Sequence, residues 1–272
     1  MKQMLLPNGE EIFYLDKLTA DWVIQEVFIE NVYLQHGITI NDGDIIFDVG
    51  ANMGFFSYYA SKQAKNLQIY TFEPVPDTFE VLEANLANLS HNIKNYNIGL
   101  SDENGEAEIH YMPHSSGNSS FNRIDVNFKV DKILENYDEL REIKPQEFPK
   151  IPKFLRKLLL RPYFKYMYKK GIEIQCPLRT LSDIIAENKI DRINLLKIDA
   201  ENHEKQVLQG INDEDWGKIQ QIAMEVHTSA MGCANLNQEL TDLLTKKGFT
   251  CFQGLKSCDT LMGVYMIYGR RL

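Results

Sequence analysis

The stretch DIIFDVGANMGFFS at residues 44–57 decides the fold class. Its first half is a short run of β-branched and aromatic residues, which predicts a buried strand that ends at Val49. Gly50 then permits a tight turn, and Gly54 lets the helix predicted over 55–65 pack close to its strand or to a ligand. The N–H groups at the start of that helix face whatever binds at the turn. The stretch therefore predicts a strand, a ligand-binding turn and a helix.

Strands and helices alternate along the rest of the chain. Further strands are predicted at 68–73, 95–98, 106–111, 172–176, 193–198 and 220–226, and helices at 77–89, 180–187, 203–210 and 236–247. Two strand-like runs at 249–253 and 263–268 close the chain as an antiparallel hairpin. This order predicts a Rossmann-like three-layer α/β sandwich with a mostly parallel seven-stranded sheet.

The predicted organisation is a single domain over residues 1–272, interrupted by one insertion. Residues 1–43 form a lead-in of helices and strands, and residues 44–111 and 172–272 form the core. Residues 112–171 form a helical insertion or lid. A chain of this length can bury one large core and still carry such an insertion.

The composition excludes several classes of protein. Hydrophobic residues make up 44 % of the chain and charged residues 25 %, which excludes a disordered chain or a disulfide-dense mini-protein. No apolar run approaches the roughly 20 residues that span a bilayer, so no stable membrane insertion is expected. We expect no secretory signal at the N-terminus, and the four cysteines show no CxxC spacing. We therefore expect free thiols in a reducing cytoplasm.

The net charge of −9 disfavours nucleic acid as a partner, but the basic residues are not evenly spread. Residues 150–170 hold eight Lys or Arg and no acidic residue, interleaved with leucine and aromatic residues. Three interpretations are open: a lid over the active site, a docking surface for an acidic acyl-carrier protein, or a segment lying on anionic membrane. Pro152 and Pro162 limit the predicted helix here to about nine residues.

The turn at 48–54 differs from the GxGxxG motif of dinucleotide-binding proteins. Asn52 stands at the middle position, and residue 57 is serine. Fewer glycines leave less room for a diphosphate, which favours a nucleoside without phosphates such as S-adenosylmethionine. Glu73 ends the next strand, where a carboxylate can accept hydrogen bonds from both ribose hydroxyls. The alternatives are a nicotinamide-dependent oxidoreductase and a non-catalytic interaction domain.

Two predicted strands end in polar clusters that suit methyl transfer to a hydroxyl. Asp199, Glu201 and His203 follow one strand, and Glu225 and His227 end another. A hydroxyl is a weak nucleophile and needs a general base or a metal ion. His227 is the first choice as base and His203 the second. Asp199, Glu225 and Glu201 could hold Mg²⁺ or another divalent cation, and without metal the same carboxylates could orient the histidine.

Six separated stretches resemble the FkbM-type branch of class I S-adenosylmethionine-dependent methyltransferases. They are IIFDVGANMGFFS at 45–57, YTFEPVPDTFEVLEANL at 70–86, IGLSDENGEAEIHY at 98–111, PLRTLSDII at 177–185, LLKIDAENHEKQVLQGI at 195–211 and IQQIAMEVHT at 219–228. The chain departs from the family where KIDAEN at 197–202 replaces KIDVEG. The resemblance implies that Asp48, Gly50, Asn52 and Gly54 line the methionine end of the cofactor, with Asp199 close by. It also implies that Glu73 holds the ribose and that Ser101 and Asp102 lie near the adenine.

The resemblance also suggests an acceptor. The opening of the chain, within residues 6–44, looks like the lead-in of such enzymes in polyketide and nonribosomal peptide assembly lines. We therefore expect an O-methyltransferase acting on a hydroxyl of such an intermediate, either a small molecule or a chain bound to a carrier protein. The alternative within the same class is methylation of a free sugar or another small hydroxyl compound.

Overall fold

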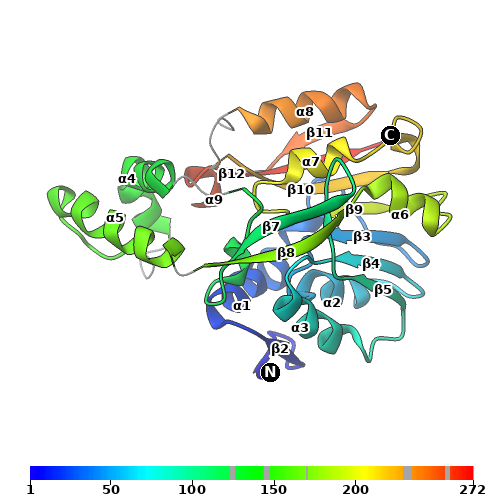
Figure 1. The fold of residues 1–272 in the computed structure, drawn as a ribbon, viewed down its shortest axis with the longest axis horizontal. Coiled ribbons are helices and arrows are strands. Elements are labelled where there is room, and N and C mark those ends of the chain that lie inside the picture. The colour runs from blue at the N-terminus through cyan, green and yellow to red at the C-terminus, as the bar shows by residue number, and fades with distance from the viewer. Residues whose placement is uncertain (123–125, 144–147, 170, 229–234, 255–257, 272) are drawn as a thin grey trace.

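A computed structural model describes residues 1–122, 126–143, 148–169, 171–228, 235–254 and 258–271. Within these ranges the centre is a seven-stranded sheet with strand order β11-β12-β10-β9-β3-β4-β5 (Figure 1). Along the chain these strands are β3 (Ile45–Val49), β4 (Gln68–Phe72), β5 (Asn92–Tyr96), β9 (Leu195–Ile198), β10 (Gln221–His227), β11 (Thr250–Gln253) and β12 (Val264–Arg270). Strand β12 runs antiparallel to β10 and β11, and the other neighbouring pairs are parallel. The predicted fold class and closing hairpin are confirmed.

Helices cover both faces of the sheet, because successive residues of each strand point to opposite sides. Phe47 and Val49 of β3 pack into the core under α6, α7 and α8, whereas Ile46 packs into the core under α2. Figure 1 shows these two layers on opposite sides of the sheet. The layer helices are α1 (Lys17–Ile24), α2 (Phe55–Ser61), α3 (Pro76–Leu86), α6 (Leu181–Glu187), α7 (Glu204–Gln209) and α8 (Leu236–Lys246).

Three strands form a second, smaller sheet beside the first. They are β6 (Gly99–Leu100), β7 (Gly105–Tyr111) and β8 (Ile172–Arg179), in the order β6-β8-β7. The strands predicted at 106–111 and 172–176 therefore lie outside the main sheet. The lead-in adds the hairpin of β1 (Lys2–Leu5) and β2 (Glu11–Tyr14), and short helical turns stand at Gln25–Ile29, Val32–Leu34, Ser116–Asn118 and Trp216–Lys218.

Two long helices form the insertion and project from the rest of the molecule (Figure 1). They are α4 (Val126–Ile143) and α5 (Lys153–Lys169), and the short helix α9 (Cys258–Leu261) lies against α4. Ile133, Tyr137 and Leu140 of α4 form a separate apolar core with Leu261 of α9. Leu160 and Phe164 of α5 pack against that core.

The expectation that prolines limit this segment to a helix of about nine residues is wrong. Helix α5 is 17 residues long and contains Pro162. Leu160 and Phe164, on either side of the proline, are both anchored in the core shared with α4, and Arg161 pairs with Asp131 of α4. These contacts outweigh the hydrogen bond that proline removes. Across the described residues, no helix combines the length and apolarity needed to cross a bilayer.

Candidate active site

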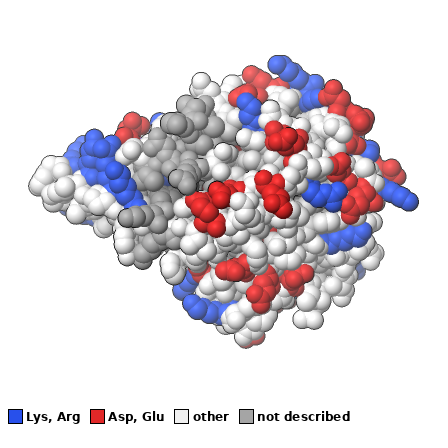
Figure 2. Space-filling view, in the orientation of Figure 1, with Lys and Arg blue, Asp and Glu red and all other residues white. Residues whose placement is uncertain are grey.

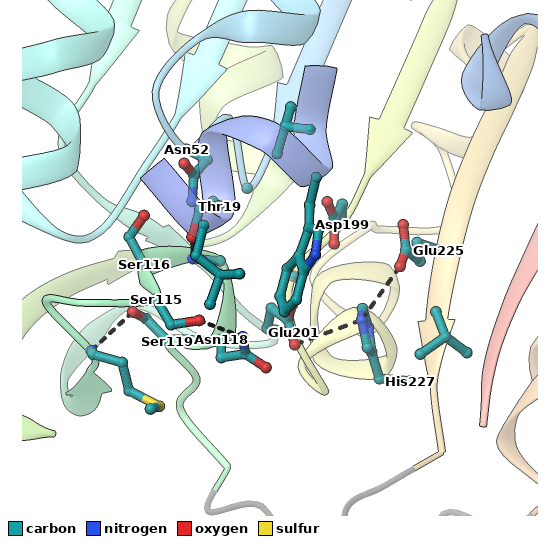
Figure 3. A pocket seen from close by; sticks show the side chains of 18 of the residues that line it. Thr19, Asn52, Ser115, Ser116, Asn118, Ser119, Asp199, Glu201, Glu225 and His227 are labelled. Atoms are coloured by element: carbon teal, nitrogen blue, oxygen red, sulfur yellow. Dashed lines mark hydrogen bonds and ion pairs between the residues drawn. The ribbon is translucent and has the colours of Figure 1, made fainter. Parts of the chain in front are cut away.

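A cavity of about 600 Å³ opens at the carboxyl ends of the central strands, the edge where open parallel sheets bind ligands. Its wall includes a group of residues at or just after the ends of these strands: Gly50, Asn52, Glu73, Asp199, Glu201, His203, Glu225 and His227. Figure 3 shows Asp199, Glu201, Glu225 and His227 arranged around one space. Much of the remaining described wall comes from α1, the segments 98–100 and 112–121, and the insertion. The cavity therefore lies between the sheet and the insertion.

The turn after β3 brings two strand ends into contact. Gly50 has a φ of 69°, and a Cβ atom on it would lie 1.7 Å from the carbonyl oxygen of Asp199. Only glycine therefore lets β3 and β9 approach this closely. Gly54, with a φ of 78°, packs instead against Leu82 of α3, and the described cavity wall does not include it.

A buried lysine holds this turn from below. The Lys197 ammonium lies 3.1 Å from Asp48 Oδ1 and 3.8 Å from Asp199 Oδ2, and it donates to the Gly50 carbonyl at 2.9 Å. Burial opposes its charge, but Asp48 and Asp199 raise the pKa of Lys197, so the side chain is a cation. Asp48 is fully buried and also accepts a hydrogen bond from Ser57 at 2.7 Å. Asp48 thus supports the turn from behind, and its direct contact with a cofactor stays a prediction.

Glu73 places a buried carboxylate in the cavity wall. Its two oxygens accept backbone hydrogen bonds from Asn52 and Val75, both at 2.9 Å. Burial raises the pKa of Glu73 to about 7, although these two donors favour the ionised form. Because a carboxylate can accept about four hydrogen bonds, it keeps acceptor capacity for a ligand.

Ser101, Asp102 and His203 form a second polar group near this end. Ser101 Oγ lies 3.0 Å from His203 Nε2 and donates to Asp102 at 2.9 Å. Burial lowers the pKa of His203 to about 4, so its ring is neutral at pH 7, and its buried Nδ1 has no hydrogen-bond partner among the described residues. His203 and Phe121 line the cavity with rings 4.8 Å apart. Ser101 and Asp102 are not among the residues of the described cavity wall, so they lie behind His203.

The carboxylates of the two polar strand ends converge, as expected if their strands are neighbours. Strand β9 pairs in parallel with β10, and the hydroxyl of Tyr33 lies 3.1 Å from Asp199 Oδ2 and 3.2 Å from Glu225 Oε2. Tyr33 is buried, and desolvation together with these carboxylates raises the pKa of its phenol well above 10. The Tyr33 hydroxyl therefore links the ends of β9 and β10 by hydrogen bonding to both carboxylates.

His227 is surrounded by acidic side chains. Its Nδ1 lies 2.8 Å from Glu204 Oε1, and its Nε2 lies 3.5 Å from Glu201 and 3.5 Å from Glu225. Burial opposes a positive charge, but Glu201 and Glu204 raise the pKa of His227 well above 6.5. These neighbours therefore favour the protonated imidazole over the neutral ring that a general base requires. A role for His227 as base stays a prediction.

The backbone that carries Glu201 is unusual. Glu201 and Asn202 are both left-handed, with φ of 43° and 69°, a conformation that costs free energy for non-glycine residues. Ser120 donates to the Glu201 carbonyl, and the Asn122 amide donates to the Asn202 carbonyl at 2.7 Å. Ser120 and Asn122 therefore hold the backbone of Glu201 and Asn202 in this conformation.

Three of these groups have the geometry of a cation site. One ligand atom from each of Asp199, Glu201 and His227 lies within 4.8 Å of the others. Two carboxylates and an imidazole suit a divalent cation. Compared with the set expected from the sequence, His227 takes the place of Glu225, which lies 3.5 Å from His227 Nε2.

Sequence reasoning missed Tyr33 and Glu204, whereas Lys197 could be expected to neutralise nearby carboxylates. Tyr33 is 166 positions from Asp199, and no motif connects the two residues. Glu204 is fully buried against His227, but an acidic residue in the first turn of a helix is common for electrostatic reasons alone. The sequence signal for Lys197 is that a lysine stands among the apolar residues of INLLKI at 193–198.

Comparison with known proteins places the chain in a family. The family model described as "Methyltransferase FkbM domain" matches residues 48–251. A fibrillarin pre-rRNA processing protein of Methanococcus jannaschii has a TM-score of 0.45 at 11 % identity, with 99 % of this chain and 82 % of that chain covered.

Two relatives match at higher identity. The 31-O-demethyl-FK506 methyltransferase FkbM of Streptomyces tacrolimicus is 31 % identical over 257 residues, which cover 92 % of this chain and 89 % of that protein. The AMB antimetabolite synthetase AmbE of Pseudomonas aeruginosa is 32 % identical over 265 residues, which cover 90 % of this chain but only 11 % of that protein. Because the family model spans most of the chain, the protein belongs to the FkbM methyltransferase family.

Proposed function

We propose that the protein is an S-adenosylmethionine-dependent O-methyltransferase. The observation that carries this proposal is the convergence of Asp199, Glu201, Glu225 and His227 on one cavity next to the Gly50 turn. A hydroxyl has a pKa far above 7 and needs a proton acceptor or a cation beside it, which such a cluster supplies. The relative from Streptomyces tacrolimicus is named a 31-O-demethyl-FK506 methyltransferase, and the letter O in that name refers to an oxygen atom.

The residues present fit the cofactor. Glu73 offers a buried carboxylate for the ribose hydroxyls, and His203 has a buried ring nitrogen that lacks a partner. Gly50 lines the cavity, so a ligand can approach the backbone of this turn. In this arrangement Glu73 holds the ribose, His203 and Phe121 flank the adenine, and Gly50 and Asn52 face the methionine end.

When bound, the cofactor supplies a methyl group on a sulfonium leaving group. The protein then has to place the acceptor oxygen in line and favour its ionised form. We assign Asp199, Glu201 and His227 to a divalent cation, which would favour the alkoxide and take the place of the Nε2 proton of His227. Glu225 lies outside this set of three. We assign its carboxylate the role of accepting the proton of the acceptor hydroxyl. Without a cation, the imidazolium of His227 would stabilise the alkoxide instead.

Titration with S-adenosylhomocysteine tests the cofactor site. We expect one molecule to bind per chain, and Glu73→Ala to weaken binding at least about tenfold, because the ribose hydroxyls lose a charged acceptor. Glu80→Ala is the matched control, since Glu80 is exposed on α3. Absence of binding at millimolar ligand, or equal affinity of Glu73→Ala and Glu80→Ala, would overturn the assignment.

Calorimetry with Mn²⁺ on metal-depleted protein tests the cation site. We expect Glu201→Gln and His227→Gln to abolish binding, whereas Glu225→Gln retains it within about tenfold, as expected for a group beside the ligands. If all three variants bind Mn²⁺ like the unaltered protein, or if that protein binds none, the chemistry proceeds without a cation at these residues.

We further propose that the acceptor is a polyketide or peptide intermediate, free or tethered to a carrier protein. The relative AmbE is named a synthetase, and the match covers a small part of it. Figure 2 shows Lys and Arg gathered over the projecting insertion. Part of this positive charge pairs with acidic residues of α4, since Arg156 pairs with Asp138 and Arg161 with Asp131.

The surface that α5 offers to a carrier protein is therefore partly apolar. Four large side chains on it are exposed by half or more, namely Phe154, Leu158, Leu159 and Tyr166, and Tyr163 is also exposed by more than half but lines the cavity. Basic side chains such as Lys157 and Lys165 are exposed on the same helix. Comparing turnover of one acceptor in free and carrier-bound form tests this partner, and a Leu158→Asp variant should slow only the carrier-bound reaction.

A further inference from the structure

The cavity has a second end, which the cofactor and the carboxylate cluster leave unexplained. Ile133 on α4, Leu160 and Phe164 on α5, Phe148, and Met262 after α9 line it there. These residues belong to the apolar core of the insertion or pack directly against it. One face of that core therefore forms a cavity wall instead of being closed by protein.

Most charged groups of the described wall lie at the sheet, but Glu26 and Lys129 also line the cavity, four positions from Trp22 and Ile133 respectively. Asp199, Glu201 and Glu225 lie at the carboxyl ends of the sheet strands. The charge of Lys129 lowers the pKa of Glu201, and its ammonium donates a hydrogen bond to Asn118. The residues that α5 and the segment 148–151 contribute to the described wall are all uncharged. A polar or charged ligand group placed there would lose its hydration with little compensation.

The polar atom of Tyr137 is already used. Its hydroxyl donates to the carbonyl of Pro149 at 2.8 Å, and the side chain is 1 % exposed. On the opposite side, α1 presents Leu18 and Trp22 to the same cavity. These two side chains are 40 % and 37 % exposed, which leaves large apolar surface without protein cover. An apolar ligand between α1 and α5 would cover both sides.

We propose that this chamber, defined by Leu18, Trp22, Ile133, Phe148, Leu160 and Phe164, binds an aliphatic chain of the acceptor. The acceptor is then amphiphilic: its hydroxyl lies at the Asp199–His227 cluster, and its chain extends under α4 and α5. The inference rests on the proposed function for the position of the hydroxyl. It excludes a compact, fully polar acceptor such as a free sugar.

Displacement of the uncharged fluorophore N-phenyl-1-naphthylamine by linear primary alcohols tests the chamber on the full chain. From butanol to decanol we expect affinity to rise about fourfold for each added methylene and then level off where the chamber ends. Affinities that do not change with chain length, or stronger competition from a hexose than from octanol, would overturn the proposal.

Two positions on α5 provide a matched pair of variants. Leu160 lines the chamber, whereas Leu158, two residues away, is 66 % exposed and absent from the described cavity wall. Leu160→Gln should weaken octanol binding at least about fivefold, since a polar group then faces the chain, and Leu158→Gln should leave it unchanged. The reverse order would place the binding on the outer face of α5 and overturn the proposal.

A third variant separates loss of the chamber from loss of folding. Leu160→Trp fills space without adding charge, so short alcohols should bind as before while the levelling-off shifts to shorter chains. An unshifted chain-length limit would contradict the assignment. Titration with S-adenosylhomocysteine on the same samples reports the cofactor site, so failure of the chamber and failure of the proposed function give different results.

Discussion

The two walls of the cavity, one from the sheet and one from the insertion, differ in where their ion pairs lie: buried on the sheet and at the surface on the insertion. On the sheet, the Lys197 and Asp48 side chains are 4 % and 0 % exposed and lie against each other. On the insertion, Arg161 pairs with Asp131 at the surface, and apart from Lys129 the residues that face the cavity are uncharged. A buried charge is costly without its partner, whereas surface pairs contribute little. The sheet can therefore fix the geometry of the reacting groups, while the insertion can vary to suit the acceptor.

The largest expected effect comes from removing the buried cation. Lys197→Met leaves Asp48 without its ion pair, and we expect the free energy of unfolding to fall by about 3–5 kcal/mol. Urea unfolding measures it. Lys205→Met is the control, because Lys205 pairs with Glu239 in solvent and should cost no more than about 1 kcal/mol. Equal losses for both variants would contradict the difference between buried and surface charges.

The next effect concerns the neutral histidine of the sheet wall. Burial lowers the pKa of His203 from 6.5 to about 4. The unfolded chain therefore binds more protons between these two values, and stability falls as the pH is lowered through that window. From pH 6.5 to pH 4.5 we expect a loss of about 2 kcal/mol that is absent in His203→Gln. Parallel pH profiles of the two unfolding free energies would contradict a buried, neutral ring.

A smaller effect is expected on cofactor affinity. Because the pKa of Glu73 is raised to about 7, the carboxylate is mostly ionised at pH 8 and mostly protonated at pH 6. If ribose hydroxyls donate to the ionised form, the affinity for S-adenosylhomocysteine should fall about tenfold between pH 8 and pH 6. The Glu73→Gln variant should show a flat profile in the same calorimetric titration. A flat profile in the unaltered protein would remove the carboxylate from ribose binding.

The smallest effect is expected on the insertion. Arg161→Gln removes a pair whose side chains are 32 % and 48 % exposed, so the loss in unfolding free energy should stay below about 1 kcal/mol. Urea unfolding of this variant beside Lys197→Met compares the two walls directly. A loss as large as that of Lys197→Met would show that the insertion is held by charge rather than by its apolar core.

The sheet wall was largely predictable from sequence because local patterns define it. Residues 46–49 are buried on both faces of the sheet, as a central parallel strand requires. The polar residues at the ends of β9 and β10 meet because those strands are neighbours. Tyr33 and Glu204 were not predictable, since their partners are fixed by tertiary packing. Helix α5 was predicted too short because a local rule for Pro162 ignored the core that Leu160 and Phe164 share with α4.

A crystal structure of the protein with S-adenosylhomocysteine and Mn²⁺ tests the proposed active site most directly. We expect the adenosyl group between Glu73 and His203, and an anomalous peak from one Mn²⁺ bound by Asp199, Glu201 and His227. Ligand density elsewhere, with the space beside Glu73 filled by side chains, would contradict the proposed site. Cofactor in place with no peak at these three residues would contradict the cation alone.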